Sequence, residues 1–305
     1  MTTEQLLKNL ERPCSKIDVI LDTDAYNEID DQFAIAYMLA NRDKLNVKAI
    51  YAAPFHNDKS SGPKDGMEKS YDEIKKVLSM IESTGDIEVL KGSDSYLQDE
   101  NTPVKSDAAA HLIKLAGNYS TGNPLYVVAI GAITNIASAL IFAPEIRENI
   151  VVVWLGGSGH HWMDIKEFNM FQDVAAARVI FGCGVPLVQL PCQGVVSAFT
   201  ISEPELEKWL LGKNKICDYL ARNTIEEANS YASGRPWTRV IWDVTAVAWL
   251  IDGRFFHERL EKSPIPEYDG YYAFNNDTRH FIKYIYHINR DELMDDMIAK
   301  LLKLT

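Results

Sequence analysis

Five acidic residues stand within ten positions near the start of the chain: Asp22, Asp24, Glu28, Asp30 and Asp31. Like charges this close together cost several kcal/mol unless they are protonated or neutralised by a cation. Carboxylate oxygens are the ligands that Ca²⁺ and Mg²⁺ prefer, whereas softer metals favour nitrogen and sulfur. One such aspartate alone would be explained as a helix cap or a turn residue, but five together predict a metal site.

These acids lie between a predicted strand and a predicted helix. Residues 17–21 form an apolar run of strand length that ends directly before the first acid. Residues 33–39 then carry apolar side chains at the spacing of an amphipathic helix. The stretch as a whole therefore predicts a strand, an acidic loop and a helix.

The chain continues with the same alternation of strands and helices. Further strands are predicted at 47–53, 87–90, 125–130, 150–155 and 186–190, and helices at 65–81, 106–116, 134–140 and 173–181. Continuous apolar strands are typical of a parallel sheet covered on both faces. The order predicts an α/β fold with an open, mostly parallel, doubly wound (Rossmann-like) sheet and helices on both faces.

Past residue 200 the pattern changes to a helical extension in the C-terminal third. Helices are predicted at 203–211, 215–230, 243–251 and 291–302, with a loop at 234–237 and turns at 268–270 and 275–277 around late strands. No low-complexity linker separates this region from the preceding one. We therefore expect residues 1–305 to form a single domain.

Composition narrows the class of protein and its surroundings. A formal net charge of -12 and a pI near 5.1 argue against a nucleic-acid partner. No apolar segment approaches the ~20 residues of a membrane span, and residues 1–12 lack the apolar core of a signal peptide. The four cysteines are scattered in a way that fits neither a disulfide framework nor a zinc site. We expect a cytoplasmic protein without a membrane or nucleic-acid partner.

Other polar residues follow other predicted strands. They are Asn57, the segment 131–135 with Thr134, the segment 156–161 with His160 and His161, the pair Glu167 and Asn169, and Asp243 before a late helix. Taken singly, most of these would be turn, cap or surface loop residues. Ligands of open α/β sheets bind beyond the carboxyl ends of the strands, so we expect these residues to converge on one rim.

Together the motifs resemble the inosine–uridine nucleoside hydrolase family. Its signature is DTD, a short loop, DD and a helix, which matches residues 22–31. Residues 131–135 resemble the family's GPLTN, residues 167–169 with Asp173 resemble its EFN and downstream Asp, and residues 242–250 resemble its HDPxAVAxL helix start. These matches occur in family order from about residue 17 to 251.

The resemblance implies a cofactor and a reaction. It implies Ca²⁺ held by Asp24, Asp31, Asp243 and the backbone carbonyl of Thr134, with Asp24 taking a proton from a metal-bound water. That water would attack C1′ of a ribonucleoside and release ribose and free base. A carboxylate-lined pocket suits the oxocarbenium-like transition state of such a bond cleavage. Family members are commonly dimers or tetramers, which implies a homodimer or homotetramer.

The resemblance also implies a set of substrate contacts. Asp30, Asn57, Glu167 and Asn169 would bind the ribose hydroxyls, and His161 lies near a position where members often have a ribose-binding Asn. Binding of the sugar diol by the metal would select ribose over 2′-deoxyribose.

Two departures from the family pattern bear on the substrate. The loop between DTD and DD has five residues, 25–29, instead of three. Trp242 replaces a His that is proposed to protonate the leaving base in many members; it can stack on a base but is no acid. The proton would then come from His160, His161, Tyr231 or Arg235, or from solvent, and the base preference stays open.

Two other functions compete with this interpretation. Asp22 and Asp24 after a strand also resemble the haloacid dehalogenase phosphatases, but Tyr26 occupies the motif's Thr or Val position and no later lysine motif is present. A catalytically silent, calcium-dependent nucleoside- or riboside-binding protein is the second alternative, because the leaving-group His is absent. It would tolerate Asp24→Asn, whereas a hydrolase would lose most of its rate.

Overall fold

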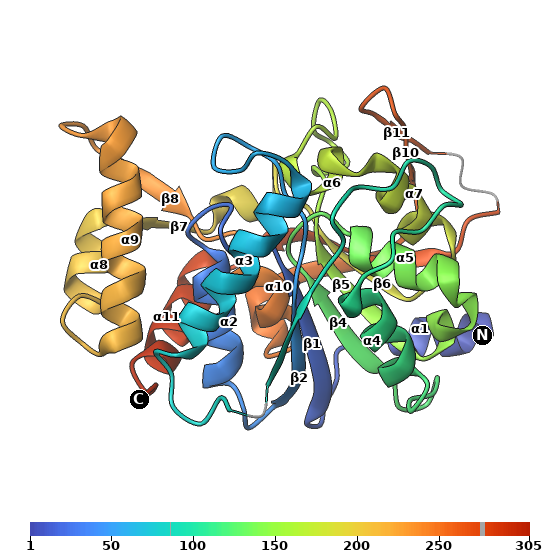
Figure 1. Ribbon diagram of the computed structural model, residues 1–305, viewed down its shortest axis with the longest axis horizontal. Coiled ribbons are helices and arrows are strands. Elements are labelled where there is room, and N and C mark those ends of the chain that lie inside the picture. The colour runs from blue at the N-terminus through green and yellow to red at the C-terminus, as the bar shows by residue number, and fades with distance from the viewer. Residues whose placement is uncertain (86, 275–277) are drawn as a thin grey trace.

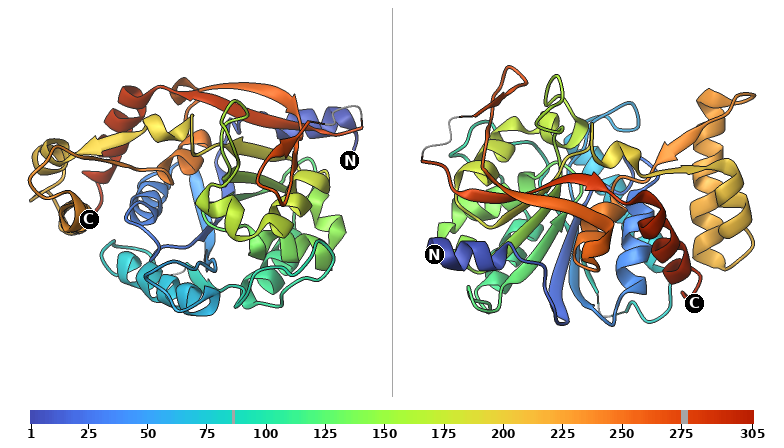
Figure 2. Two further views of the ribbon diagram at one scale, coloured as in Figure 1. Left: turned by 90° about the horizontal axis from the view of Figure 1, so that it is seen from above. Right: turned by 180° about the vertical axis from the view of Figure 1, so that it is seen from behind.

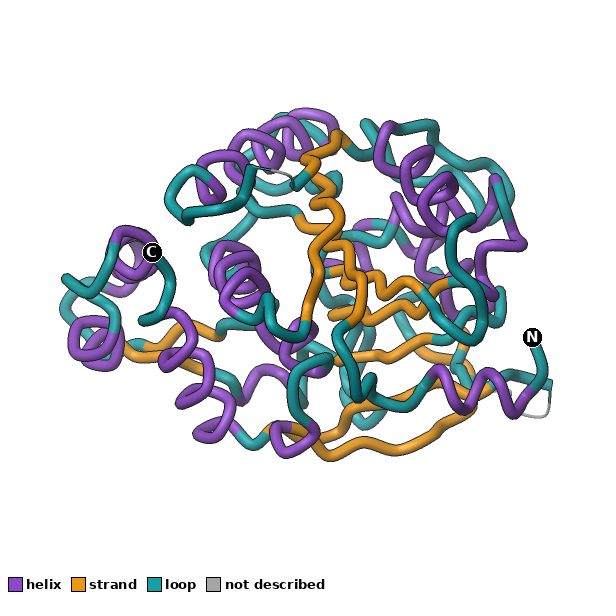
Figure 3. Tube along the Cα trace, turned by 90° about the horizontal axis from the view of Figure 1, so that it is seen from below, coloured by secondary structure: helices purple, strands orange, loops and turns teal. Residues whose placement is uncertain are grey.

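An eight-stranded sheet forms the centre of the computed structural model, which describes residues 1–85, 87–274 and 278–305 (Figures 1 and 3). The strand order is β3-β2-β1-β4-β5-β6-β12-β9, and every neighbouring pair is parallel except β12 and β9. The strands are β1 (Ile17–Thr23), β2 (Leu45–Ala52), β3 (Glu88–Lys91), β4 (Leu125–Ala129), β5 (Ile150–Leu155), β6 (Leu187–Leu190), β9 (Phe256–Lys262) and β12 (Phe281–Ile288). This mostly parallel sheet confirms the predicted fold class.

Helices cover both faces of the sheet (Figure 3). One face packs against α2 (Asp31–Ala40), α3 (Pro63–Leu78), α10 (Val244–Trp249) and α11 (Arg290–Leu301). The other packs against α4 (Asp107–Ala116), α5 (Thr134–Phe142) and α7 (Val174–Gly182). Two further helices are α1 (Thr3–Asn9) and α6 (Phe168–Gln172), and short 3₁₀ turns lie at Pro144–Glu148, Val196–Ala198 and Gly253–Phe255.

Alternate residues of the central strands supply the two cores. In β1, Val19 and Leu21 belong to one hydrophobic cluster, while Ile20 between them belongs to the other. Every residue of β4 and β5 is buried, as expected for strands that are covered on both faces. The apolar runs in the sequence therefore mark the middle of the sheet.

The C-terminal third combines the predicted helices with strands that the sequence analysis did not delimit. Helices α8 (Glu203–Trp209) and α9 (Lys215–Ala232) stand to one side of the sheet, joined to it through the antiparallel pair β7 (Thr200–Ser202) and β8 (Thr238–Val240) (Figures 1 and 2). Strands β9 and β12 cross the back of the molecule and complete the sheet (Figure 2). The small pair β10 (Ile265–Pro266) and β11 (Tyr272–Ala273) follows β9.

Late strands were expected in this region, but their bounds were not predicted. β9 contains His257, Glu258, Arg259, Glu261 and Lys262, so its apolar content is too low to be recognised as a strand. The predicted turn at 268–270 is present, whereas the turn at 275–277 lies outside the described residues. Within the described ranges, no helix has both the length and the apolarity that crossing a membrane requires. All four cysteines are free.

The side chain of Asn135 ties several strand ends together at the point where the strand order reverses. Its amide nitrogen donates to Asp22 Oδ1 at 2.7 Å, and its Oδ1 accepts from the backbone N–H of Ser93 at 2.7 Å and from the Ser93 hydroxyl at 2.9 Å. Asp22 is fully buried, and this burial raises its pKa to about 7. The amide of Asn135 therefore supplies a donor that a carboxyl group at this position would lack.

We predict that Asn135→Asp lowers the free energy of unfolding by about 3 kcal/mol at neutral pH, because it places a second carboxyl beside buried Asp22. Asn135→Ala, which removes the donor without adding a charge, should cost less, about 1–3 kcal/mol. Urea unfolding at pH 8 and pH 5 measures both.

Buried carboxyls with raised pKa values bind more protons in the folded state, so the deficit of the Asp variant should shrink as the pH falls. Equal deficits for the two variants at both pH values would contradict the role of the Asn135 amide.

Candidate active site

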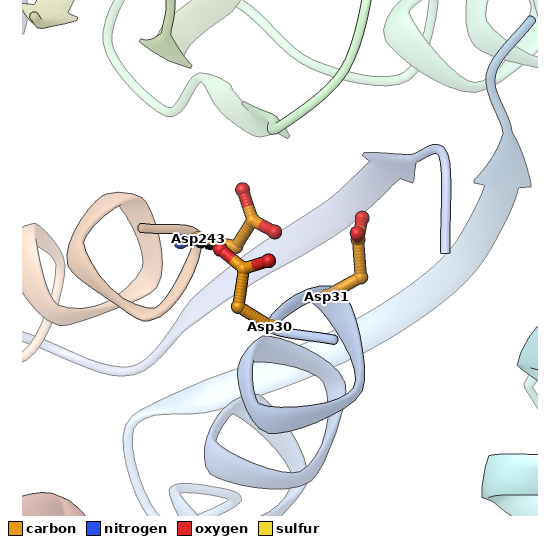
Figure 4. Close-up of side chains that lie close together, drawn as sticks. All are labelled: Asp30, Asp31 and Asp243. Atoms are coloured by element: carbon orange, nitrogen blue, oxygen red, sulfur yellow. Dashed lines mark hydrogen bonds between the residues drawn. The ribbon is translucent and has the colours of Figure 1, made fainter. Parts of the chain in front are cut away.

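Three carboxylates from two helix starts meet at the carboxyl edge of the sheet. Oxygen atoms of Asp30, Asp31 and Asp243 all lie within 4.8 Å of one another, and all three side chains are buried (Figure 4). Asp30 and Asp31 begin α2, Asp243 precedes α10, and these two helices pack against each other. The prediction that residues far apart in sequence converge on one rim is confirmed for these acids.

These carboxylates are not used as helix caps. Asp30 and Asp243 occupy the N-cap positions of α2 and α10, yet neither side chain accepts a bond from its own helix. The backbone N–H of Asp243 instead donates to Asp30 Oδ2 at 3.3 Å, and the Thr23 hydroxyl donates to Asp31. The ordinary structural reason for an aspartate at a helix start therefore does not apply here.

Asp24 faces the same cavity from the end of β1. Its side chain is 1% exposed, and its Oδ2 is buried with no hydrogen-bond partner among the described residues. The close approach of Gly131 confines it, since a Cβ at that position would lie 3.0 Å from the Asp24 carboxyl. A buried acceptor without a donor is costly, so this oxygen is available to a ligand.

The four carboxyls are held in an unfavourable electrostatic environment. Burial, followed by the charges of neighbouring acids, raises the pKa values of Asp24, Asp30 and Asp243 well above their usual range. Burial raises the pKa of Asp31 to about 7. Among the described residues no salt bridge reaches any of the four. Such a set of crowded oxygen donors, with no salt bridge to any of them in the described part of the chain, fits a hard divalent cation.

A cavity of about 120 Å³ opens beside these acids. It is lined by Asp24, Asn27, Glu28, Asp30, Asp31, Ile130, Leu155, Glu167, Phe168, Asn169, Cys192, Gln193, Trp242 and Asp243. The lining includes the predicted residues Glu167, Asn169 and Trp242. They come from strand ends and helix starts on the carboxyl side of the sheet, where a ligand of a doubly wound fold is expected.

Glu167 and Asn169 are positioned by backbone groups. Glu167 accepts from the N–H groups of Gly157, Asn169 and Met170 at 2.7, 2.9 and 3.1 Å, and it begins α6. Burial raises its pKa in spite of these bonds. Asn169 donates through Nδ2 to the carbonyls of Ile130 and Leu155 at 3.1 and 3.0 Å, which fixes it across the ends of β4 and β5.

Three other predicted residues do not belong to the described lining of the cavity. Thr134 is fully buried and donates its hydroxyl to Asp173 at 2.7 Å. Asn57 donates through Nδ2 to Asn27 Oδ1 at 2.7 Å, so it supports a lining residue from behind. His161 is exposed and lies against Gly159 and Gly194.

The candidate proton donors also lie elsewhere. His160 stacks on Tyr284, with ring centroids 4.0 Å apart, and its Nδ1 is 2.5 Å from Glu261 Oε2. The Tyr231 hydroxyl accepts from Arg239 at 2.8 Å, and Arg235 is exposed. None of these side chains is among the described residues that line the cavity.

Several residues of the cavity wall were not predicted from the sequence. Cys192 and Gln193 follow β6, so the rule that strand ends carry the site could have found them. Phe168 stands inside the motif of residues 167–169. Of the inserted loop, Asn27 and Glu28 line the cavity, whereas Tyr26 faces away toward α3 and α9.

An ionic network joins the inserted loop to the helical extension. Arg239 Nη2, in β8, lies 3.0 Å from Glu28 Oε2 and 3.1 Å from Glu227 Oε2 in α9. Lys59 Nζ lies 3.1 Å from the other carboxylate oxygen of Glu227. Because Glu28 belongs to the loop that lines the cavity, Arg239 fixes one wall of the site.

The sheet is doubly wound, and the acidic cavity lies at the edge where the strand order reverses. This combination is typical of an α/β enzyme whose site offers oxygen ligands to a metal ion. Residues 19–279 match the family described as inosine-uridine preferring nucleoside hydrolase, and the chain belongs to this family. It is therefore an N-ribosyl hydrolase, an enzyme that cleaves N-glycosyl bonds.

Known proteins similar to this chain include nucleoside hydrolases and an effector protein that shares the fold. The pyrimidine-specific ribonucleoside hydrolase RihA of Escherichia coli O7:K1 is 25% identical over 266 residues, which are 79% of this chain and 81% of the relative. The plant nucleoside hydrolase PpNRh1 has a TM-score of 0.75 at 17% identity, covering 94% of this chain and 99% of that one. The type III effector protein XopQ, solved with adenosine diphosphate ribose, has a TM-score of 0.72 at 16% identity, covering 99% of each chain.

Calcium should raise the melting temperature of the protein, since a ligand bound only by the folded state adds about 2.7 kcal/mol at a hundredfold excess over its Kd. Asp31→Asn should raise the melting temperature of the metal-free protein, because it removes one of four crowded charges, and should abolish most of the calcium-induced rise. Differential scanning calorimetry with EDTA or calcium measures both effects.

The matched control is Asp291→Asn, whose side chain is 91% exposed; it should keep the full calcium-induced rise. A calcium response of Asp31→Asn equal to that of the parent would contradict the assignment of a cation site.

Removing the Arg239 guanidinium should loosen the inserted loop. We predict that Arg239→Gln lowers the free energy of unfolding by about 1 kcal/mol. The loss in the double variant with Glu28→Gln should differ from the sum of the two single losses by about 0.5–1 kcal/mol, which is the coupling energy of the pair. Urea unfolding of the two single variants and the double variant measures this coupling.

Arg254→Gln is the control, because Arg254 pairs with Asp252 while its own side chain is 77% exposed. If the two substitutions at 28 and 239 are strictly additive, Glu28 is not held by Arg239.

Proposed function

We propose that this protein hydrolyses the N-glycosidic bond of ribonucleosides to ribose and free base, with Ca²⁺ as its metal. The observation that carries the proposal is the group of four buried aspartates, Asp24, Asp30, Asp31 and Asp243, which face one cavity and have no salt-bridge partner among the described residues. When bound, a divalent cation would supply a water of lowered pKa and an anchor for the sugar diol.

The residues that would hold the cation are Asp24, Asp31 and Asp243, with the backbone carbonyl of Thr134. The unpartnered Oδ2 of Asp24 and the mutual closeness of Asp31 and Asp243 support this donor set. Asp24 would also accept the proton of the attacking water, because its Oδ2 has no other hydrogen-bond partner among the described residues.

The sugar would be bound by the residues around the same cavity. Asp30 and Glu167 would accept hydrogen bonds from ribose hydroxyls, and Asn169 would offer the oxygen that remains after its nitrogen has donated to the backbone. Asn57 would act through Asn27. The negative charge of this wall would stabilise positive charge that develops at C1′ in the transition state.

His161 and Trp242 would contact the substrate beyond the sugar. Trp242 already lines the cavity, so stacking on the base requires no rearrangement. His161 lies outside it and would contact a ligand only after a movement of the loop that carries it.

A calcium-dependent riboside-binding protein without turnover is the second candidate function. It is favoured by the lack of any histidine among the described lining residues and by the similarity to XopQ, which was solved with adenosine diphosphate ribose. The two candidates share the sugar site and differ in the role of Asp24.

We further propose that residues 1–305 act as one domain, in the cytoplasm, as a homodimer or homotetramer serving nucleoside salvage. The hydrophobic cluster that contains sheet residues also contains Leu206 of α8 and Leu220 of α9, which supports one continuous unit.

The test is a reducing-sugar assay across ribonucleosides and their 2′-deoxy forms, with calcium or a chelator. Ribose release should require calcium and should be much weaker for the deoxy forms, because a missing hydroxyl leaves buried polar groups unpaired. Asp24→Asn should lower kcat about 10²–10⁴-fold.

The control is Asp18→Asn, at the opposite end of β1 and partly exposed, which should keep the parent's rate. Calcium-dependent riboside binding that persists in Asp24→Asn, with no ribose released by either form, would overturn the hydrolase in favour of the binding protein.

A further inference from the structure

Asn27 occupies the middle of the inserted loop, residues 25–29, and lines the cavity, where it is 8% exposed. Its backbone N–H donates to the carbonyl of Asp24 at 2.7 Å, which closes a turn directly after β1. The next residue, Glu28, is paired with Arg239. Asn27 is therefore held in place before a ligand binds, which lowers the entropy cost of any contact that its side chain makes.

A chain of hydrogen bonds orients the amide of Asn27. The backbone N–H of Lys59 donates to Asn57 Oδ1 at 2.9 Å, and Asn57 Nδ2 donates to Asn27 Oδ1 at 2.7 Å. Because a backbone N–H can only donate, it fixes the sense of both amides in turn. The oxygen of Asn27 is thus engaged, and its Nδ2, which bonds to no other described residue, is the group left for the cavity.

Asn169 lines the same cavity and is oriented in the opposite sense. Both hydrogens of its Nδ2 are used by the carbonyls of Ile130 and Leu155, so it presents its oxygen to a ligand. The cavity therefore offers an amide N–H at the end of β1 and an amide oxygen at the ends of β4 and β5. A hydroxyl group both donates and accepts, so a ligand with several hydroxyl groups, such as a sugar, can satisfy both amides.

We infer that Asn27 determines sugar specificity, because its Nδ2 donates to the oxygen of one hydroxyl of the ribose 2′,3′-diol. Asn57 is a positioning residue, which acts on the sugar only through Asn27. The inference rests on the proposed function and adds a residue of the inserted loop to its sugar site. The diol is the expected partner because Asn27 shares a turn with Asp24, which would hold the cation that binds the diol.

The first experiment measures by calorimetry how the calcium-loaded full chain binds methyl β-D-ribofuranoside, a probe that carries no base and needs no turnover. Asn27→Ala should weaken the Kd about tenfold, because a sugar hydroxyl loses its donor. The matched control is Tyr26→Ala, in the same loop but 42% exposed and directed away from the cavity. It should keep the parent's Kd.

The second experiment separates a direct contact from a structural effect. It compares kcat/KM for uridine and inosine with the values for their 2′-, 3′- and 5′-deoxy forms. Asn27→Ala should lower kcat/KM about tenfold for the ribonucleosides and the 5′-deoxy forms. The loss should disappear for either the 2′- or the 3′-deoxy form, which lacks the bonded hydroxyl, whereas a merely structural role would lower all values by one factor.

The role of Asn57 is tested by a double variant. Asn57→Ala leaves the amide of Asn27 free to turn, so it should weaken binding of the ribofuranoside about threefold. Because Asn57 acts through Asn27, the double variant should bind no more weakly than Asn27→Ala alone. Circular dichroism of all variants checks that they fold.

Four outcomes would overturn the inference: a parent that binds no ribofuranoside, an unchanged Kd in folded Asn27→Ala, one common loss for all the deoxy forms, or additive losses at 27 and 57. The last three leave the proposed hydrolysis intact wherever the parent releases ribose. A parent that releases no ribose from any ribonucleoside would refute the hydrolysis, while the ribofuranoside Kd still tests Asn27. The two failures are therefore distinguishable.

Discussion

Mutual repulsion among buried carboxylates is the constraint on which this structure depends. Asp24, Asp30, Asp31 and Asp243 are each no more than 4% exposed, and no salt bridge to them occurs among the described residues. Folding places them together because β1 and β4, at which the strand order reverses, bring the starts of several helices to one edge. Repulsion among these carboxylates destabilises the folded state. A hard cation bound between them would relieve this repulsion, and the relief would add to the free energy of cation binding.

Much of the fold was predictable because its strands and helices follow from patterns within short stretches of the sequence. The apolar runs of β1, β4 and β5 and the alternation with helices follow from periodicity, and the structure confirms the doubly wound sheet. β9 was not delimited because a charged edge strand resembles a loop in sequence. β12 lies inside the sheet and is mostly apolar, so its pattern could have been recognised. The pairing of β12 with β6 joins residues about a hundred positions apart, and no local pattern encodes it.

The candidate site was predictable at the level of strand ends and not at the level of side-chain direction. The sequence places Asn57 and His161 near the rim, but the structure turns their side chains to Asn27 and to two glycines. Conversely, Cys192 and Gln193 enter the cavity from a strand end whose residues show no chemical motif. Which way a side chain points depends on tertiary packing, which a single sequence does not display.

The site has two parts that are built from neighbouring residues of the chain. Asp243 and Glu167 belong to the acidic part, and Trp242 and Phe168, one residue away from each, belong to the aromatic part. The acidic part is fixed by helix starts and backbone N–H groups, so it tolerates little change. The aromatic side chains form few such bonds. A substitution at 242 would therefore alter the aromatic part while leaving the carboxylates in place.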